Sequence, residues 1–340
     1  MDNIGDRGLP STLCSGGHEM HFRKGFMFET DVRRPECHCS AICELPSGHL
    51  FGVWYAGSRE KEPDVALMGA RWVASTGAWT PPRVLWDTPG QPEGNAVPFV
   101  PPDGLLHLFF VTVVGEGWDT AQLKHMTSAD EGETWTEPVV MGEPLGTMVR
   151  NKPLYLSDGR TILPMYDDRE GGSFMYISDD GGVTWHRSAR IPGPGGHIQP
   201  TLFQKHDGSI VALMRNDEPR LIQRSQSFDR GETWTAAEST ALPNPNAGCD
   251  IVALPGGRLL LVFNDSPRRR SPLSIALSED QGETWPRKLD LETDDAEFSY
   301  PSIIRARNGL IHLSYTWRRK AIAHVIFDEE WFLANSHPRA

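Results

Sequence analysis

An eight-residue pattern, Ser-x-Asp-x-Gly-x-Thr-Trp, occurs four times in the sequence, at 128–135, 178–185, 227–234 and 278–285. The Asp residues of consecutive copies lie 50, 49 and 51 positions apart. A near-constant period of this size is typical of folds that repeat one supersecondary unit. The pattern, called the Asp-box below, therefore restricts the chain to a repeat architecture before any single residue is considered.

A second periodic element extends the repeat to six units. It consists of two strand-like apolar runs joined by a turn, and the turn glycines are Gly48, Gly104, Gly159, Gly208, Gly257 and Gly309. Glycine at such a turn supplies the positive φ that tight hairpins require. Each unit has room for two further strands. The sequence therefore predicts an all-β fold, a six-bladed β-propeller with four-stranded antiparallel blades and Asp-box turns.

The two ends of the sequence are expected to meet in this ring. The sixth unit ends with one strand, 321–327, after Trp317, so a strand within 20–30 is expected to complete it and close the ring. Residues 1–19 are polar and Gly-rich and are expected to be flexible. Length alone suggests roughly two domains, but a closed ring predicts a single domain over residues 1–340.

Composition argues against several classes of partner. The 33 Lys and Arg residues face 45 Asp and Glu, for a net charge of −12, whereas nucleic acids and anionic membranes select a broad basic face. No apolar run reaches the roughly 18 residues of a membrane span, and the first residues lack the apolar centre of a secretory signal. The five cysteines are odd in number and lack zinc-ligand spacing. We therefore expect a cytoplasmic protein with reduced thiols, no metal and no cofactor.

The aspartates of the Asp-boxes are expected to be structural. Each carboxylate can accept hydrogen bonds from its own turn, the Gly takes the strained backbone position, and the Trp packs between blades. An active site occurs once in a ring, whereas these residues recur in blade after blade. We therefore assign a structural role to Asp130, Asp180, Asp229 and Asp280.

Functional residues are expected at one end of the ring axis. The start of each inner strand and the end of the next strand share this end, and the Gly-turns lie at the other. The residues at these positions are rich in acids, bases and aromatics, which suit a sugar that carries a carboxylate. The candidates are His38, Arg59, Glu60, Asp64, Lys152, Gln199, Arg215, Asp250, Arg270, Glu297, Tyr300 and Trp317.

These features together resemble the sialidase (neuraminidase) superfamily, whose members are six-bladed propellers with Asp-boxes. Residues 40–57, 242–250 and 297–319 are most similar to the bacterial and plant sialidase-like branch with BNR repeats. The resemblance implies that Tyr300 is the nucleophile and that Asp64 is the acid/base residue. It also implies that Arg215 and Arg270 hold the substrate carboxylate.

Two positions depart from the sialidase pattern. The first carboxylate-binding arginine aligns with His38, and Arg34 lies four residues upstream of it. The glutamate that pairs with the tyrosine aligns with Gln199, which cannot act as a base, although a tyrosine with a pKa of about 10 needs one to attack. Either Glu297 or Asp250 takes over this role, or Tyr300 has another function.

The sequence leaves three functions open. We expect a sialidase-type hydrolase that acts on a non-reducing-end acidic sugar, with His38 and Lys152 as auxiliary contacts. A uronic-acid lyase is an alternative, in which a Tyr/His pair removes a proton while arginines neutralise the carboxylate. A non-catalytic carbohydrate-binding propeller is the third. The sugar, its linkage and the oligomeric state are not specified by the sequence.

Overall fold

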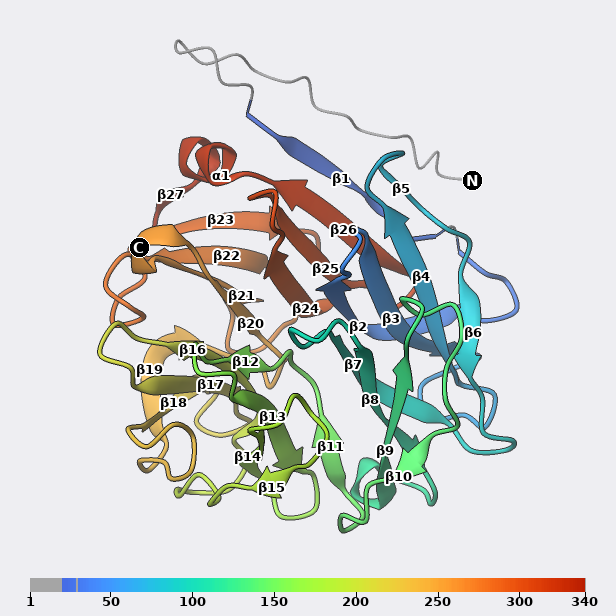
Figure 1. Cartoon of the computed structure of the whole chain (residues 1–340). Coiled ribbons are helices and arrows are strands. Elements are labelled where there is room, and N and C mark those ends of the chain that lie inside the picture. The colour runs from blue at the N-terminus through green and yellow to red at the C-terminus, as the bar shows by residue number, and fades with distance from the viewer. Residues whose placement is uncertain (1–19, 29, 340) are drawn as a thin grey trace.

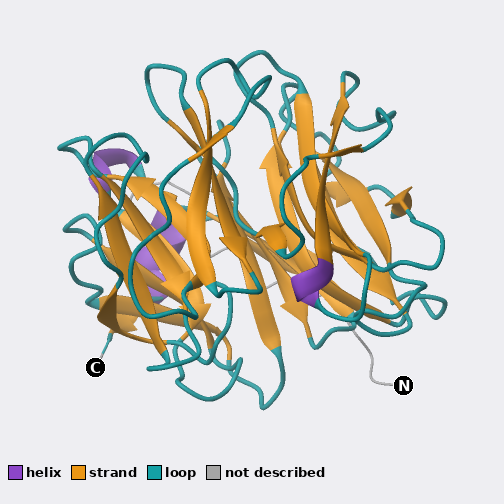
Figure 2. Cartoon of the chain, turned by 90° about the horizontal axis from the view of Figure 1, so that it is seen from below, coloured by secondary structure: helices purple, strands orange, loops and turns teal. Residues whose placement is uncertain are grey.

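Six antiparallel sheets form a ring around a central axis (Figure 1). The computed structural model describes residues 20–28 and 30–339, so the flexibility expected for residues 1–19 concerns a segment outside the described residues. Seen from the side, the strands run between two ends of the ring, and the loops gather at both ends (Figure 2). The prediction of a six-bladed β-propeller is confirmed.

The first three blades follow the chain in order. Blade 1 contains β2 (Glu36–Glu44), β3 (Leu50–Gly57), β4 (Ala66–Val73) and β5 (Ala78–Trp79), and β6 (Arg83–Trp86) also pairs with β4. Blade 2 contains β7 (Glu93–Phe99), β8 (Leu106–Val113), β9 (Ala121–Ser128) and β10 (Val139–Val140). In blade 3 the inner strand is split into β11 (Thr147–Val149) and β12 (Leu154–Tyr155), which both pair with β13 (Thr161–Asp167), and β14 (Gly172–Ser178) and β15 (His186–Arg187) follow.

The other three blades complete the ring. Blade 4 contains β16 (Ile198–Gln204), β17 (Ile210–Arg215), β18 (Leu221–Ser227) and β19 (Glu238–Pro243). Blade 5 contains β20 (Asp250–Ala253), β21 (Leu259–Asn264), β22 (Leu273–Ser278), β23 (Arg287–Glu292) and the short edge strand β27 (His337–Pro338). Blade 6 contains β24 (Phe298–Arg305), β25 (Ile311–Trp317), β26 (Ala321–Phe327) and β1 (Phe22–Phe26). Two short 3₁₀ turns, η1 (Trp118–Thr120) and η2 (Pro255–Gly257), lie in connections.

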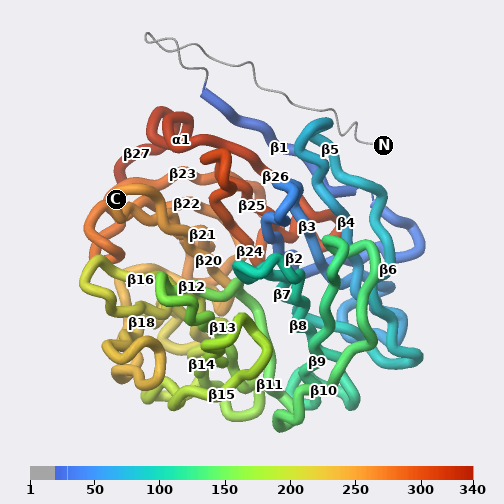
Figure 3. Tube along the Cα trace, viewed as in Figure 1, coloured from blue at the N-terminus to red at the C-terminus, as the bar shows by residue number. Residues whose placement is uncertain are grey.

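Blade 6 joins strands from both ends of the described chain. Strand β1 pairs antiparallel with β26, from Phe22 opposite Phe327 to Phe26 opposite Ala323. In Figure 3 the blue β1 accordingly lies beside the red β26. The Asp328 carboxylate accepts bonds from His21 N and Trp331 N, both at 2.7 Å. The second bond caps helix α1 (Glu329–Asn335), which the sequence did not predict.

The apolar core lies between the blades. Strands β3, β8 and β13 are buried along their whole lengths, as their continuous apolar sequences indicate. The Asp-box tryptophans contribute to this packing, and Trp185 of blade 3 meets Phe109 of blade 2 edge-on at 5.6 Å between ring centroids. Among the described residues, no helix is long and apolar enough to cross a bilayer.

Each Asp-box aspartate is used within its own turn. Asp280, for example, accepts bonds from Thr284 N at 2.8 Å, Thr284 Oγ1 at 2.5 Å and Ser278 Oγ at 2.8 Å. Asp130, Asp180 and Asp229 make the same set of contacts with the Ser and Thr of their boxes. The Asp-box is therefore a hydrogen-bonded turn repeated in four blades.

Candidate functional site

Backbone irregularities direct three side chains to the axis. Each of the inner strands β2, β16 and β24 pairs with the strand that follows it, and each pairing has a register shift near the beginning of the inner strand. At each shift one residue other than glycine has a positive φ, namely Cys39 (59°), Gln199 (56°) and Tyr300 (52°). A bulge re-aims side chains next to active sites, and a non-glycine residue in this region costs about 1–3 kcal/mol. The three residues therefore mark the candidate site.

Tyr300 lies among positive charges. Its hydroxyl accepts a hydrogen bond from Arg215 Nη1 at 2.8 Å, and the guanidinium groups of Arg150 and Arg270 lie 5.1 and 5.2 Å from its ring centroid. Burial opposes ionisation of the phenol, but the charges of Arg215 and Arg270 outweigh it, so the pKa of Tyr300 is lowered from its ordinary value. These charges therefore make Tyr300 easier to ionise than an ordinary tyrosine.

A chain of hydrogen bonds through Arg215, Tyr166 and Asn95 links the three bulged residues. Arg215 Nη1 also donates to Gln199 Oε1 at 3.0 Å, and Gln199 Nε2 donates to the Tyr166 hydroxyl at 3.2 Å. Asn95 Nδ2 donates to the same hydroxyl at 2.8 Å, and its Oδ1 accepts from Cys39 Sγ at 3.0 Å. Gln199 thus holds Arg215 against Tyr300, and no carboxylate takes part in this chain.

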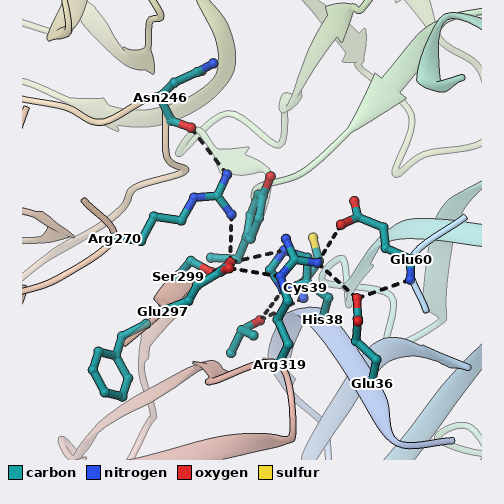
Figure 4. A network of polar contacts seen from close by, with 12 residues as sticks. Glu36, His38, Cys39, Glu60, Asn246, Arg270, Glu297, Ser299 and Arg319 are labelled. Atoms are coloured by element: carbon teal, nitrogen blue, oxygen red, sulfur yellow. Dashed lines mark hydrogen bonds and ion pairs between the residues drawn. The ribbon is translucent and has the colours of Figure 1, made fainter. Parts of the chain in front are cut away.

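Arg319 connects the acidic side of the site (Figure 4). Its Nε donates to Glu297 Oε2 at 2.9 Å, and its Nη1 contacts Glu60 at 2.5 Å and Glu36 at 3.2 Å. Glu297 also accepts from Arg270 Nη1 at 2.8 Å. Burial alone would raise the pKa of Glu297, but the charges of Arg270 and Arg319 together have the larger effect. The pKa is therefore lowered from its ordinary value, and this carboxyl is held ionised. Glu297 is therefore bound by two arginines and is poorly placed as a base for Tyr300.

The turn that carries Arg319 is strained. Arg318 and Arg319 have φ values of 54° and 56°, and Lys320 N donates to Trp317 O at 3.0 Å across them. A two-residue hairpin turn with positive φ at both positions favours Asn-Gly rather than bulky side chains. A strained turn of this kind is retained only where surrounding contacts stabilise it. Here the carboxylates of Glu36, Glu60 and Glu297 supply those contacts to Arg319.

His38 is neutral in this setting. It is 1% exposed, its ring meets the Tyr300 ring edge-on at 4.6 Å, and its Nδ1 lies 3.0 Å from Thr316 Oγ1. Burial and then the charges of Arg319 and Arg270 hold its pKa well below the ordinary value. His38 therefore does not supply the positive charge of the arginine with which it aligns.

Lys152 and Asp250 form a buried ion pair further along the axis. Lys152 Nζ lies 2.7 Å from both Asp250 carboxylate oxygens, which also accept from Thr201 Oγ1 at 2.7 Å and Ile303 N at 2.9 Å. Lys152 lines a cavity of about 590 Å³ with Tyr155 at the opposite end of the inner strands. These contacts tie the inner strands of blades 3 to 6 together and occupy the Asp250 carboxylate.

Asp64 and Arg34 lie beside blade 1. The Asp64 carboxylate accepts from Ser58 N at 2.9 Å and Ser58 Oγ at 2.8 Å, and its carbonyl accepts from Arg34 Nη1 at 2.6 Å. Both residues line a cavity of about 910 Å³ together with Trp54 and Trp79. Within the described residues no hydrogen bond joins either of them to Tyr300, and the role of Asp64 stays a prediction.

Two other candidates lie apart from Tyr300. Arg59 is exposed and pairs with Glu62 at 2.7 Å. Trp317 packs edge-on to Phe26 of the same blade, at 5.2 Å between ring centroids. Neither residue makes a described hydrogen bond or cation–π contact with Arg215, Arg270 or Arg319, although the Arg318 guanidinium lies 4.6 Å from the Trp317 ring centroid.

Asp168 is a carboxyl near the arginines with a perturbed ionisation. Burial raises its pKa against the pull of Arg215, and the negative charges of Asp119 and Asp167 add to the rise. A carboxyl that keeps its proton to higher pH suits proton donation. Glu60 instead accepts from the Tyr55 hydroxyl at 3.2 Å and pairs with Arg319. In the described part of the chain, no cluster of three His, Cys, Asp or Glu residues could bind a metal ion.

Several site residues do not stand out in the sequence. Tyr55 and Tyr166 lie inside buried strands, where an aromatic residue is typical of a core. Arg319 belongs to the basic run Arg318-Arg319-Lys320. This run lies between two strand-like segments, and that position in a turn is the signal that could have pointed to it. Cys39 is marked only by its bulge and positive φ, which the sequence does not show.

The comparisons with known proteins agree with this geometry. Residues 48–313 match the family described as BNR repeat-like domain. A Bacteroides fragilis sialidase is 25% identical to this chain. The match covers 61% of this chain and 41% of the length of that protein. Mouse sialidase-3 is 24% identical over 86% of this chain and 80% of its own length.

Solved structures show the same fold. The structure of a Hadza microbial sialidase superposes with a TM-score of 0.80 at 19% sequence identity, and the match covers 91% of this chain and 69% of that one. Since the family match covers most of the chain and the sialidase resemblance spans sequence and fold, the protein belongs to the BNR repeat-like family of the sialidase superfamily.

Proposed function

We propose that the protein is a sialidase-like glycosidase acting on a non-reducing-end sugar that bears a carboxylate. The observation that carries the proposal is the contact of the Tyr300 hydroxyl with Arg215, next to Arg270. Arginine binds a carboxylate with two parallel hydrogen bonds. A phenol beside such a clamp would lie close to an anomeric carbon that carries the carboxylate.

The arginines have distinct roles in this proposal. Both described hydrogen bonds of Arg215 use Nη1, so its Nη2 is free of protein contacts within the described residues and can bind substrate. Arg270 and Arg319 are already aligned by Glu297. Arg319 provides the third positive charge, which the neutral His38 does not. The site would then be selective for an acidic sugar.

Tyr300 would act as the nucleophile. Its phenolate oxygen forms a bond to the anomeric carbon while the bond to the leaving oxygen breaks, and a carboxylic acid protonates that oxygen. Water then hydrolyses the tyrosyl–sugar bond with the same carboxylate as base. A phenolate attacks a carboxylate-bearing carbon with less repulsion than an aspartate or glutamate would.

The proton donor is one of two carboxyl groups. The sequence resemblance assigns this role to Asp64, whose carboxylate is bound by Ser58. We favour Asp168, because its raised pKa and its position near Arg215 suit a proton donor. Glu60 is less suitable, because its carboxylate is engaged by Arg319 at 2.5 Å and by the Tyr55 hydroxyl at 3.2 Å.

A uronic-acid lyase is the second candidate, and one contact favours it. The His38 ring touches the Tyr300 ring edge-on at 4.6 Å, which places a neutral imidazole beside a phenolate. Such a pair could remove the proton next to a carboxylate held by arginines. The product would be unsaturated and would absorb in the ultraviolet.

The test is a turnover screen with sialosides and uronides, read by mass spectrometry and ultraviolet absorbance. Release of a free acidic sugar supports the hydrolase, and growth of absorbance supports the lyase. Binding of an acidic sugar without any product, unchanged in Tyr300→Phe, would contradict both and indicate a binding protein.

A further inference from the structure

Arg150 lies at the interruption of the inner strand of blade 3. Strand β11 ends at Val149 and β12 begins at Leu154. Pro153 has no N–H to continue the ladder, and Asn151 Nδ2 instead donates to Gln199 O at 3.2 Å and Pro200 O at 3.0 Å. The break frees Arg150 from the strand and lets its side chain reach across the axis to blade 6.

The Arg150 guanidinium is buried without a carboxylate. The residue is 2% exposed, and its one described hydrogen bond joins Nη2 to Pro301 O at 3.1 Å. Its Nε and Nη1 have no partner among the described residues, and no ion pair to Arg150 occurs there. A buried and unpaired charge is costly, so a nearby negative charge would stabilise this arrangement.

Tyr300 is in contact with Arg150 and can supply that charge. The Arg150 guanidinium lies 5.1 Å from the Tyr300 ring centroid, where the ring face attracts a cation. The Tyr300 hydroxyl accepts from Arg215, and no described residue accepts its proton. A phenolate at Tyr300 would therefore compensate the Arg150 charge.

The other charges facing Tyr300 do not replace this interaction. Arg215 and Arg270 lie 6.0 and 5.2 Å from the Tyr300 ring centroid, and Arg270 is paired with Glu297. Glu60 and the Cys39 thiol oppose ionisation of Tyr300, and Glu60 is paired with Arg319. The remaining contacts come from groups without charge: the neutral His38 and, through Arg215, Gln199 and Tyr166. Arg150 is thus the one arginine in contact with Tyr300 that lacks a described hydrogen bond to a side chain.

We propose that Arg150 is a positioning residue that stabilises the Tyr300 phenolate through the ring face, so that the phenol loses its proton to water without a partner carboxylate. Tyr300 can then act as the nucleophile even though Gln199 stands where sialidases have the glutamate that pairs with the tyrosine. The inference rests on the proposed role of Tyr300, but ionisation of this side chain can be measured without any substrate.

The experiment titrates Tyr300 by the ultraviolet absorbance of tyrosinate. Each spectrum is corrected by the same protein with Tyr300→Phe, so that the difference reports this residue alone. Arg150→Met removes the charge, Arg150→Gln removes it but keeps a donor for Pro301 O, and Arg150→Lys keeps it. Arg187→Met is the matched control, because Arg187 lies 3.6 Å from the Phe174 ring and away from the site.

We expect the two neutral variants to raise the Tyr300 pKa by about one unit or more, a tenfold loss of phenolate at a given pH. Arg150→Lys and the control should leave the pKa within a few tenths. If Arg150→Met does not fold, Arg150→Gln decides the question. An unchanged pKa in a folded neutral variant overturns the inference. A raised pKa without turnover in the wild type supports it and contradicts only the proposed function.

Discussion

The Tyr300 hydroxyl lies 2.8 Å from Nη1 of Arg215, and no carboxylate among the described residues bonds to it. In the proposed mechanism this hydroxyl attacks the anomeric carbon, so an arginine takes the position next to the nucleophile that a base would occupy. An arginine cannot accept a proton. In this proposal the phenol therefore loses its proton without a neighbouring carboxylate base, and the positive charge around it favours this ionisation.

Replacement of the nucleophile gives the first prediction. Tyr300→Phe should lower kcat/KM at least a hundredfold, because the phenylalanine ring keeps the packing but cannot form the covalent bond. Steady-state kinetics and circular dichroism check this. Tyr155→Phe, at the opposite end of the axis, is the control and should keep full activity. Near-normal turnover in Tyr300→Phe would exclude nucleophilic chemistry.

The proton donor is tested by a pair of variants. Asp168→Asn should lower kcat/KM by about 10²–10⁴-fold, the usual effect of losing a general acid, and should flatten the alkaline side of the pH profile. Asp64→Asn should have a much smaller effect, because the Asp64 carboxylate is bound by Ser58. Substrates with a better leaving group should rescue Asp168→Asn. A loss confined to Asp64→Asn would return the role to Asp64.

Close packing beside Tyr300 gives a third prediction. A Cβ added at Gly248 would lie 3.1 Å from Tyr300 Cδ1 and 3.2 Å from Gln199 Oε1. Gly248→Ala should therefore displace both side chains by a few tenths of an ångström and lower kcat about tenfold, since small misplacements of reacting groups are costly. Gly25→Ala, where a Cβ meets nothing within 4 Å, is the control. Equal activity of the two variants would show that the Tyr300 position is not critical.

The Asp-box turn affects stability rather than activity. Asp280→Ala removes bonds to Thr284 and Ser278 and should lower the free energy of unfolding by on the order of 1 kcal/mol. Turnover at room temperature should not change. Urea unfolding checks the prediction, with Glu279→Ala as the control because Glu279 makes no described hydrogen bond. A loss of activity without a loss of stability would give Asp280 a role in the site.

A buried histidine pair makes the closed ring sensitive to acid. His324 Nδ1 accepts from Trp79 Nε1 of blade 1 at 3.0 Å, so its Nε2 carries the proton that bonds His312 Nδ1 at 3.1 Å. Burial lowers the pKa of His312 to about 4 and holds that of His324 well below its ordinary value. Since both pKa values are depressed in the folded state, the stability they contribute is present above about pH 6.5 and is lost as pH falls toward 4.

The measurement is the free energy of unfolding at several pH values between 5 and 7. His312→Asn should reduce its slope by up to about 1.4 kcal/mol per pH unit, the effect of one proton. His337→Asn, an exposed substitution, should leave the slope unchanged. The same slope in His312→Asn and the wild type would show that the pair does not titrate on unfolding.

The fold was predictable because its signals recur. Six Gly-turns and four Asp-boxes give the blade period, and strand ends give the positions of Tyr300, Arg215 and Arg270. Lys152 and Asp250 were placed by the same rule, and in the structure they form an ion pair with each other. Bulges and the Arg318-Arg319 turn depend on tertiary contacts, so the roles of Cys39 and Arg319 could not be derived from local sequence.

The pairing of β1 with β26 has a consequence for biosynthesis. Residues 22–26 have no partner strand until residues 321–327, about 300 positions later, have emerged from the ribosome. Five blades can gather on a nascent chain, while Tyr300 and Arg319 of the sixth remain unassembled with His38 of the first. The site residues of blades 1 and 6 therefore take their final arrangement only once residues 321–327 are present, and a chain that stalls before this point carries most of the site residues without that arrangement.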